Sequence, residues 1–326
     1  MSLHGANKEN QNIRSSGSSG KRKATRPPFE DFSKEFKQRR TDPLVHYGRH
    51  FGRSIRTFCR MQPLLRNCLG RTMQLERLPL TTLSCSEIRE QAVYDNLLEM
   101  VPGLEEKLNT GSEEEVFYVA EMLTKGISSA RSDDTKGLKS VIVDWITPPN
   151  GVLNPPIQRN IKTDRGYHHP ATGRLLCPVS LDWERSDVRE ALASGDLTPS
   201  GDLWPRFLYK NGEYIEDDPW NGLLRSALLV KGYKHVFTSP SSVYKDGAVN
   251  KATRSSNARR HGMKSVTPAS IAYIATQVRF ALSSSAAFTR TDATSDSEYF
   301  YNLLIELLED PEEQAEVQDL LTWWNQ

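Results

Sequence analysis

Cationic side chains gather in one polar stretch of this 326-residue chain, between residues 245 and 264. Guanidinium, amide and imidazole groups bind phosphate and carboxylate groups, and guanidinium does so through two parallel hydrogen bonds. A helix expected to begin at Pro268 adds the positive potential of its N-terminal amides. The pattern predicts an anion-binding or nucleic-acid-binding site made by Arg254, Asn257, Arg259, Arg260 and His261. We call residues 254–261 the cationic segment.

The cationic segment also has two simpler interpretations. It is either a solvated connector between two helices or an electrostatic clasp on acidic helices near the C-terminus. Proteins that bind single-stranded nucleic acid interleave aromatic side chains with basic ones, and Tyr244 is the one aromatic residue in this stretch. The alternatives stay open at this point.

A second chemically capable group lies between residues 164 and 177. Asp164, His168, His169 and Cys177 form the densest set of candidate metal ligands. Zinc takes three or four ligands at recognisable spacing, and adjacent side chains on a strand face opposite ways. We therefore predict no metal and no cofactor, and interpret the histidines as a pair beside a turn with one ring buried and hydrogen-bonded. A hydrolase or nuclease that uses Asp164, His168 and His169 is the alternative.

Other catalytic patterns are incomplete. One run has the residue types of a catalytic triad but no GxSxG elbow: His235, Ser239, Ser241, Ser242 and Asp246. The paired carboxylates at 133–134 and 217–218 each precede a predicted helix, where capping explains them. Neither a P-loop nor a GxGxxG motif is present. The residues favour a protein without catalytic activity.

Two helices are expected to hold the cationic segment in place. Residues 219–230 and 268–282 both begin with a proline that follows a capping residue, Asp218 or Thr267. The second helix carries an apolar stripe at helical spacing: Ile271, Ile274, Ala275, Val278 and Leu282. Both helices should therefore pack into the core and present the segment between them.

Local signals mark further elements. Ser84 with Glu87 and Ser112 with Glu115 form capping-box patterns, and Ser132 precedes a third helical stripe that ends at Pro148. Residues 147–218 are rich in proline and glycine, which predicts a loop-rich insert. Within this insert we expect a short helix over 187–193 and a small β-hairpin over 167–176.

An arginine face is expected between residues 44 and 77, where helix is predicted up to Pro63 and again up to Gly70. Four arginines recur on one side of it: Arg49, Arg53, Arg56 and Arg60. This face either follows phosphate groups or pairs with acidic helices elsewhere in the chain, and we favour the pairing. The acidic helices predicted over 295–326 offer such partners and also a docking surface of their own.

Charge is distributed unevenly along the chain. Residues 1–66 hold 15 Lys and Arg against 5 Asp and Glu, whereas residues 291–326 hold 10 Asp and Glu and no Lys or Arg. Residues 1–43 contain too little apolar surface to fold, so we predict a disordered basic tail. Two clusters in it resemble a bipartite nuclear-import signal: Lys21, Arg22, Lys23, Lys37, Arg39 and Arg40. A tail that only increases solubility is the alternative.

Compartment signals are few. The four cysteines form no CxxC pair, which is typical of reduced thiols. The first residues lack a secretory apolar segment, and no apolar run approaches the ~20 residues of a membrane span. These features predict an intracellular protein that does not enter a membrane, with a nuclear location if the import-like clusters are used.

Long phrases of the chain are distinctive: DRGYHHPATGRLLCP (164–178), KATRSSNARRHGM (251–263) and SVTPASIAYIATQVRFALSSSAAF (265–288). They resemble an uncharacterised domain family of basidiomycete, mushroom-forming fungi. The resemblance covers about residues 44–326, and it implies a fungal source and one folding unit over this range. It implies no activity, cofactor or catalytic residue.

The sequence therefore predicts an all-α fold of about seven to nine helices. It is expected to comprise a tail over 1–43 and a single domain over 44–326, with the insert at 147–218. The leading function is a nuclear, non-enzymatic protein that contacts nucleic acid or another anionic partner through the cationic segment. A protein–protein scaffold that uses the acidic C-terminal hairpin is the alternative, and the hydrolase or nuclease is the second.

Overall fold

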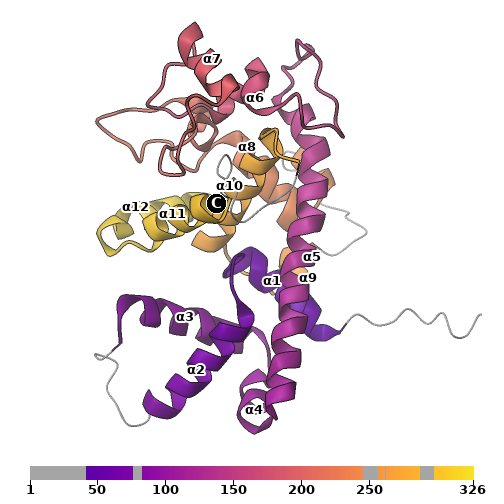
Figure 1. Cartoon of the computed structure of the whole chain (residues 1–326), viewed down its shortest axis with the longest axis vertical. Helices are drawn as coiled ribbons and strands as arrows, with labels where there is room; N and C mark the ends of the chain where they lie inside the picture. The colour runs from indigo at the N-terminus through magenta and orange to yellow at the C-terminus, as the bar shows by residue number, and fades with distance from the viewer. Residues whose placement is uncertain (1–41, 76–82, 245–255, 261, 287–296) are drawn as a thin grey trace, which may run out of the picture. The chain divides into compact units, whose positions relative to one another are not determined.

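The computed structural model describes residues 42–75, 83–244, 256–260, 262–286 and 297–326 (Figure 1). In these residues twelve α-helices form and no strand, apart from isolated bridges between Pro178 and Pro205 and between Tyr209 and Leu223. The predicted all-α class is confirmed, with a few more helices than expected because several are short. The contacts of residues Thr41–Gln326 cluster into one compact unit.

The helices follow one another with short connections and three single-turn elements that matter below. Their bounds are α1 (Pro43–Ser54), α2 (Met61–Leu75), α3 (Cys85–Met100), α4 (Leu104–Thr110), α5 (Glu113–Ile146), η3 (Gly166–His168), α6 (Pro170–Leu176), α7 (Ser186–Ser194), α8 (Ala227–Tyr233), η6 (Lys234–Thr238), α9 (Asn257–Arg260), α10 (Pro268–Leu282), α11 (Ser297–Glu309), η8 (Pro311–Glu313) and α12 (Gln314–Trp324). No helix in the described residues is both long and apolar enough to cross a membrane.

Local capping signals place several helix starts as predicted. Ser84 and Ser112 each form both halves of a capping box, with Glu87 and Glu115. Thr267 caps α10: its hydroxyl accepts from the amide of Ser270 at 3.1 Å, and the Ser270 hydroxyl accepts from the amide of Thr267 at 3.0 Å. These short-range hydrogen bonds satisfy amides that have no partner inside the helix, and the sequence alone reveals them.

The helix predicted over 219–230 is wrong in its first half. The helix here is α8, which begins seven residues later, at Ala227, with Ser226 as its cap. Gly222 and Leu224 have left-handed backbone conformations, with φ of 74° and 57°, and these interrupt a right-handed helix. Leu224 is fully buried, and its carbonyl accepts a hydrogen bond from the Trp324 indole at 3.1 Å. Tertiary packing therefore overrides the Asp218–Pro219 capping signal.

The β-hairpin predicted over 167–176 is also wrong. Residues 166–168 form η3, and residues 170–176 form α6. The imidazole Nδ1 of His169 accepts from the amide of Ala171 at 3.0 Å and so acts as the N-cap, with Pro170 at the first helical position. Gly173 lies against the Trp183 ring, where any side chain would clash.

The long helix α5 joins two helices that the sequence predicted separately. It has 34 residues and continues through Ser132, the expected N-cap of the second helix. The two carboxylates after Ser132 do not cap a helix. Asp133 pairs with Arg49 at 2.9 Å and Asp134 pairs with Arg53 at 2.7 Å, both across to α1. The helix continues because these carboxylates find guanidinium partners instead of free amides.

Two apolar clusters form the core, and α5 contributes to both. The smaller cluster gathers residues of α1 to α4 on the first half of α5, including Val119 and Leu123. The larger gathers α8, α10, α11 and α12 on its second half, including Leu138 and Ile142. Twelve of the fifteen residues of α10 are buried, so this helix is central to the larger cluster and not the one-sided helix that its stripe predicted.

Candidate anion-binding site

A pocket of about 440 Å³ lies where α5 meets the C-terminal end of α10. Four cationic and three hydroxyl-bearing side chains line it, and none of the described residues in its wall is acidic. We call it the cationic pocket. Its lining residues are Arg131, Lys136, Lys139, Lys162, Ser128, Ser132, Thr135, Phe280 and Ala286.

One face of α5 supplies most of this lining. The six residues occupy positions 128, 131, 132, 135, 136 and 139, which recur every three or four residues and therefore point to the same side of a helix. The neighbouring acidic residues, Asp133 and Asp134, pair with arginines of α1. The helix thus sorts its charges, with carboxylates toward α1 and cations toward the pocket.

Lys162 brings a buried charge to the pocket from the loop after α5. Its side chain is 6% exposed, and its ammonium donates to the carbonyl oxygen of Phe280 at 2.5 Å. The same nitrogen lies 3.3 Å from the centre of the Phe280 ring, a cation–π contact. Burial, reinforced by the charges of Arg165 and Lys139, lowers the pKa of Lys162 to about 7.

Arg165 fixes the loop that carries Lys162. It is fully buried and donates to the carbonyl oxygen of Ala281 at 2.8 Å and to that of Arg159 at 2.9 Å. Because the last carbonyls of a helix lack amide partners and carry its negative dipole end, Arg165 and Lys162 together cap α10. Two buried cations are therefore held at this end by main-chain oxygens.

The remaining cations differ in how firmly they are held. The Arg131 guanidinium lies 5.4 Å from the Phe58 ring centre, and Thr135 donates to the Gln277 side chain at 3.0 Å. Lys136 is exposed and Lys139 is half-buried. Within the described part of the chain, no carboxylate forms an ion pair with Lys136, Lys139 or Lys162. Such a wall of cations and hydroxyls suits a multiply charged anion such as a phosphate group.

The cationic segment is described only in part. Arg254, His261 and the side chain of Arg260 lie outside the described residues. Asn257 holds α9 in place by donating to the carbonyl oxygen of Val236 at 2.6 Å, so its amide serves the fold. Arg259 is exposed and has no ion pair with a described carboxylate. The import-like clusters, Lys21 to Lys23 and Lys37 to Arg40, also lie outside the described residues.

The arginine face of α1 is engaged within the protein in its first half. Arg49 and Arg53 pair with Asp133 and Asp134, so the favoured interpretation of pairing holds for these two, with α5 and not the C-terminal helices as the partner. Arg56 and Arg60 line a separate groove together with residues of α11, among them Glu306.

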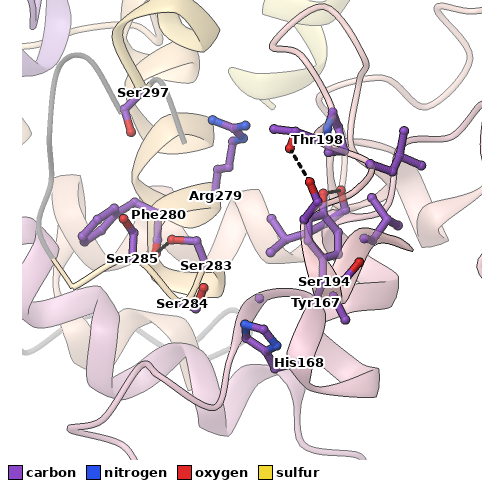
Figure 2. Close-up of a pocket in the computed structure, with 17 residues that line it drawn as sticks. Tyr167, His168, Ser194, Thr198, Arg279, Phe280, Ser283, Ser284, Ser285 and Ser297 are labelled. Atoms are coloured by element: carbon purple, nitrogen blue, oxygen red, sulfur yellow. Dashed lines mark hydrogen bonds between the residues drawn. The ribbon is translucent and has the colours of Figure 1, made fainter. Parts of the chain in front are cut away.

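The residues of the hydrolase hypothesis point to different places. His169 is buried, and its Nε2 lies 2.7 Å from the carbonyl oxygen of Pro155 while Nδ1 caps α6, which leaves neither nitrogen for a ligand. Asp164 is exposed and accepts from Thr163. His168 lines another pocket, which Figure 2 shows. Among the described residues no three His, Cys, Asp or Glu side chains are grouped so that they could hold a metal ion.

Sequence reasoning missed the cations of the pocket. The spacing of Ser128, Arg131, Thr135, Lys136 and Lys139 was a usable signal, because it forms a polar stripe on an otherwise apolar helix. Lys162 gave no local signal, because its burial depends on a contact 118 residues away in the chain.

Comparison with known proteins places the two pockets inside a family. The sequence profile of a family of unknown function (DUF6698) matches residues 125–326, which is more than half of the chain. No curated protein and no solved structure matches the chain. The resemblance to an uncharacterised family is thus confirmed for this range, while residues 44–124 lie outside the match and a basidiomycete source stays a prediction. All residues that line the cationic pocket lie within the matched range.

Proposed function

The chain belongs to the DUF6698 family, and we propose that this member is a non-enzymatic protein that binds the phosphate groups of an anionic partner in the cationic pocket. The observation that carries the proposal is the composition of the pocket wall, with four cations, three hydroxyls and no described carboxylate. The proposal keeps the anionic partner that the sequence predicts and moves the main contact from the cationic segment to α5.

Electrostatic repulsion within the pocket supports this proposal. Lys136 and Lys139 are three residues apart on one helix, a spacing at which like charges destabilise a helix by about 0.2–0.5 kcal/mol. Lys162 adds a buried charge that also lies near Lys139. A bound phosphate group would convert these repulsions into attractions. Its oxygens would accept hydrogen bonds from the hydroxyls of Ser128 and Ser132.

Nucleic acid is the class of partner that we propose first. A chain of phosphates would place one group in the pocket and leave others for exposed cations such as Lys136 and Arg259. The exposed position of Arg259, without a described carboxylate partner, supports a role for the cationic segment as a second contact. A nuclear location is part of this proposal, and it rests on the import-like clusters of the tail.

Equilibrium binding of a fluorescent single-stranded oligonucleotide at about 50 mM salt tests the proposal, with inorganic pyrophosphate as competitor. The decisive variant is Lys136→Gln with Lys139→Gln. The control is Lys125→Gln with Arg66→Gln, which removes the same charge from two exposed side chains outside the pocket. We expect the pocket variant to lose binding, the control to retain it, and pyrophosphate to compete.

Three outcomes would contradict the pocket as the site. One is no binding by the unmodified protein at this salt concentration, and another is equal weakening in the pocket variant and the control. The third is a loss of binding in Arg259→Gln with full binding in the pocket variant, which would return the site to the cationic segment.

The scaffold alternative has one observation in its favour. Glu306, Glu312 and Glu316 on α11, η8 and α12 are exposed. Two other carboxylates of this hairpin are engaged, since Glu313 accepts from the Trp220 indole at 2.7 Å and Asp319 pairs with Arg225 at 2.6 Å. Reversing the three exposed charges to Lys tests docking without removing the core residues of the hairpin. A partner that stays bound to this variant would exclude the acidic surface.

A hydrolase or nuclease has less support than either binding role, because His169 is committed to the fold through both ring nitrogens. Fusions of the tail with alanine at both basic clusters test the nuclear location directly. Retention of nuclear signal in that variant would contradict import through these clusters.

A further inference from the structure

A second pocket, of about 380 Å³, lies on the other side of the α10 C-terminus (Figure 2). Its walls come from η3, α6, α7 and the loop that follows α7, and from the residues that end α10. We call it the serine pocket. Its volume falls in the range of about 300–1,000 Å³ that is usual for small-molecule sites. Apart from Phe280, none of its lining residues lines the cationic pocket.

The polar part of the serine pocket is concentrated at one end. Figure 2 shows Arg279 entering from α10, with Ser283, Ser284 and Ser285 in the residues after it. The guanidinium of Arg279 lies 4.8 Å from the centre of the Phe300 ring, which orients it. None of the described lining residues is Asp or Glu. This end of the pocket therefore has one guanidinium surrounded by hydroxyl groups, together with the imidazole of His168.

The rest of the wall is apolar. Leu176 and Leu192 are buried in the fold and, with Leu197 and the ring of Phe280, present carbon atoms to the space. A ligand that filled this part would be excluded from water on several sides and would gain from the removal of its own apolar surface.

A glycine permits the close approach that forms the pocket floor. Gly166 has φ of 69°, and a side chain there would come within 3.1 Å of the amide nitrogen and hydroxyl oxygen of Ser284. The adjacent residue, Arg165, holds this loop to the carbonyl oxygen of Ala281 at 2.8 Å. The serines after α10 are thus fixed against η3 by a left-handed turn and a buried guanidinium.

We propose that the serine pocket binds a small amphipathic carboxylate, with the carboxylate against Arg279 and the serine hydroxyls and the apolar body against Leu176, Leu192 and Leu197. One guanidinium matches one carboxylate through two parallel hydrogen bonds, and hydroxyls satisfy the remaining oxygen lone pairs. A phosphate group carries more charge and finds four cations in the other pocket. The two sites therefore differ in the class of anion that they select, and this inference does not rest on the phosphate-binding proposal.

Calorimetric titration of the whole chain with octanoate and with 2-naphthoate tests the inference, with octanamide as the uncharged analogue of octanoate. We expect saturable binding of at least one carboxylate. Loss of the charge should weaken binding of octanamide by about tenfold or more, since hydrogen bonds between charged groups contribute about 1.5–3 kcal/mol. Inorganic phosphate should not compete.

Two variants assign the site. Arg279→Gln should reduce affinity for the carboxylate to that for the amide. Thr198→Trp fills the pocket from an exposed position in its rim and should abolish binding even if Arg279→Gln fails to fold. Lys136→Gln with Lys139→Gln should leave octanoate binding unchanged, which separates the two pockets.

The inference would be overturned by any of three results. These are no saturable binding of either carboxylate, equal affinity for octanoate and octanamide, or full octanoate affinity in a folded Thr198→Trp variant.

Discussion

The ammonium of Lys162 lies 2.5 Å from the carbonyl oxygen of Phe280 and 3.3 Å from the centre of its ring. One cation thus contacts both the main chain and the side chain of a residue that lines both pockets. The lysine receives no described carboxylate in return for its burial. Its charge is held by the negative end of α10 and an aromatic face, and it remains available to an anion that enters the cationic pocket.

The burial of Lys162 predicts a pH dependence of stability. The pKa of Lys162 in the folded protein is about 7, below the usual value of 10.5, because burial and the charges of Arg165 and Lys139 disfavour the ammonium form. Between these two values the unfolded chain binds more protons than the folded one, so the free energy of unfolding should rise with pH. The slope from this group approaches about 1.4 kcal/mol per pH unit.

Urea denaturation of the unmodified protein and of Lys162→Met between about pH 6 and pH 9 measures this contribution. The difference between the two proteins isolates Lys162 from the tyrosines, several of which have a raised pKa through burial. The variant should show the shallower rise. An identical pH dependence in both proteins would show that Lys162 keeps an ordinary pKa in the folded state.

The ion pair between Arg53 and Asp134 should contribute strongly to stability. Both hydrogen bonds of the pair are short, at 2.7 and 2.8 Å, and the Tyr273 hydroxyl donates to the same carboxylate at 2.6 Å. Both side chains are buried, so Asp134→Asn leaves an uncompensated guanidinium and should cost about 3–5 kcal/mol in the free energy of unfolding.

Asp133→Asn is the matched control for this prediction. Its pair with Arg49 lies one residue away on the same helix, but the Asp133 side chain is 59% exposed. Exposed pairs contribute about 0–1 kcal/mol, so chemical denaturation should show little change. Equal losses in the two variants would contradict the assigned difference in burial.

The contact between α1 and α5 depends on glycine. A side chain on Gly126 would clash with the carbonyl oxygen of Val45, a backbone atom that cannot move aside as a flexible side chain does. We expect Gly126→Ala to destabilise the protein by about 1–3 kcal/mol, as in other overpacked sites.

Gly70→Ala provides the opposite case. Gly70 is an exposed residue of α2 with no atom within 4 Å of an added Cβ, so alanine should stabilise the helix by about 0.5–1 kcal/mol. Thermal or chemical unfolding of both variants checks the pair. Stabilisation by Gly126→Ala would mean that the two helices lie further apart than described.

Sequence reasoning succeeded where structure depends on neighbouring residues. The cap at Thr267 and the bounds of α10 follow from a few adjacent residues, and the structure confirms both. It failed where distant contacts decide. The helix α6 depends on the ring of His169 as a cap and on packing of Gly173 against Trp183, and neither is visible in a pattern that also suits a turn.

The candidate site shows the same limit. The cationic face of α5 was readable from spacing, but the sequence reasoning treated that helix as two core elements. Lys162 reaches the face only because its loop folds back onto the end of α10. The sequence therefore predicted an anionic partner without locating the pocket that we assign to it.

The salt dependence of oligonucleotide binding tests the central proposal most directly. The slope of the logarithm of the association constant against the logarithm of salt concentration reports the number of phosphates neutralised, at about 0.7 per contact for single strands. If Lys136 and Lys139 each neutralise one phosphate, the double glutamine variant should have a slope shallower by about 1.4 than the unmodified protein. Equal slopes in the two proteins would contradict phosphate recognition in the cationic pocket.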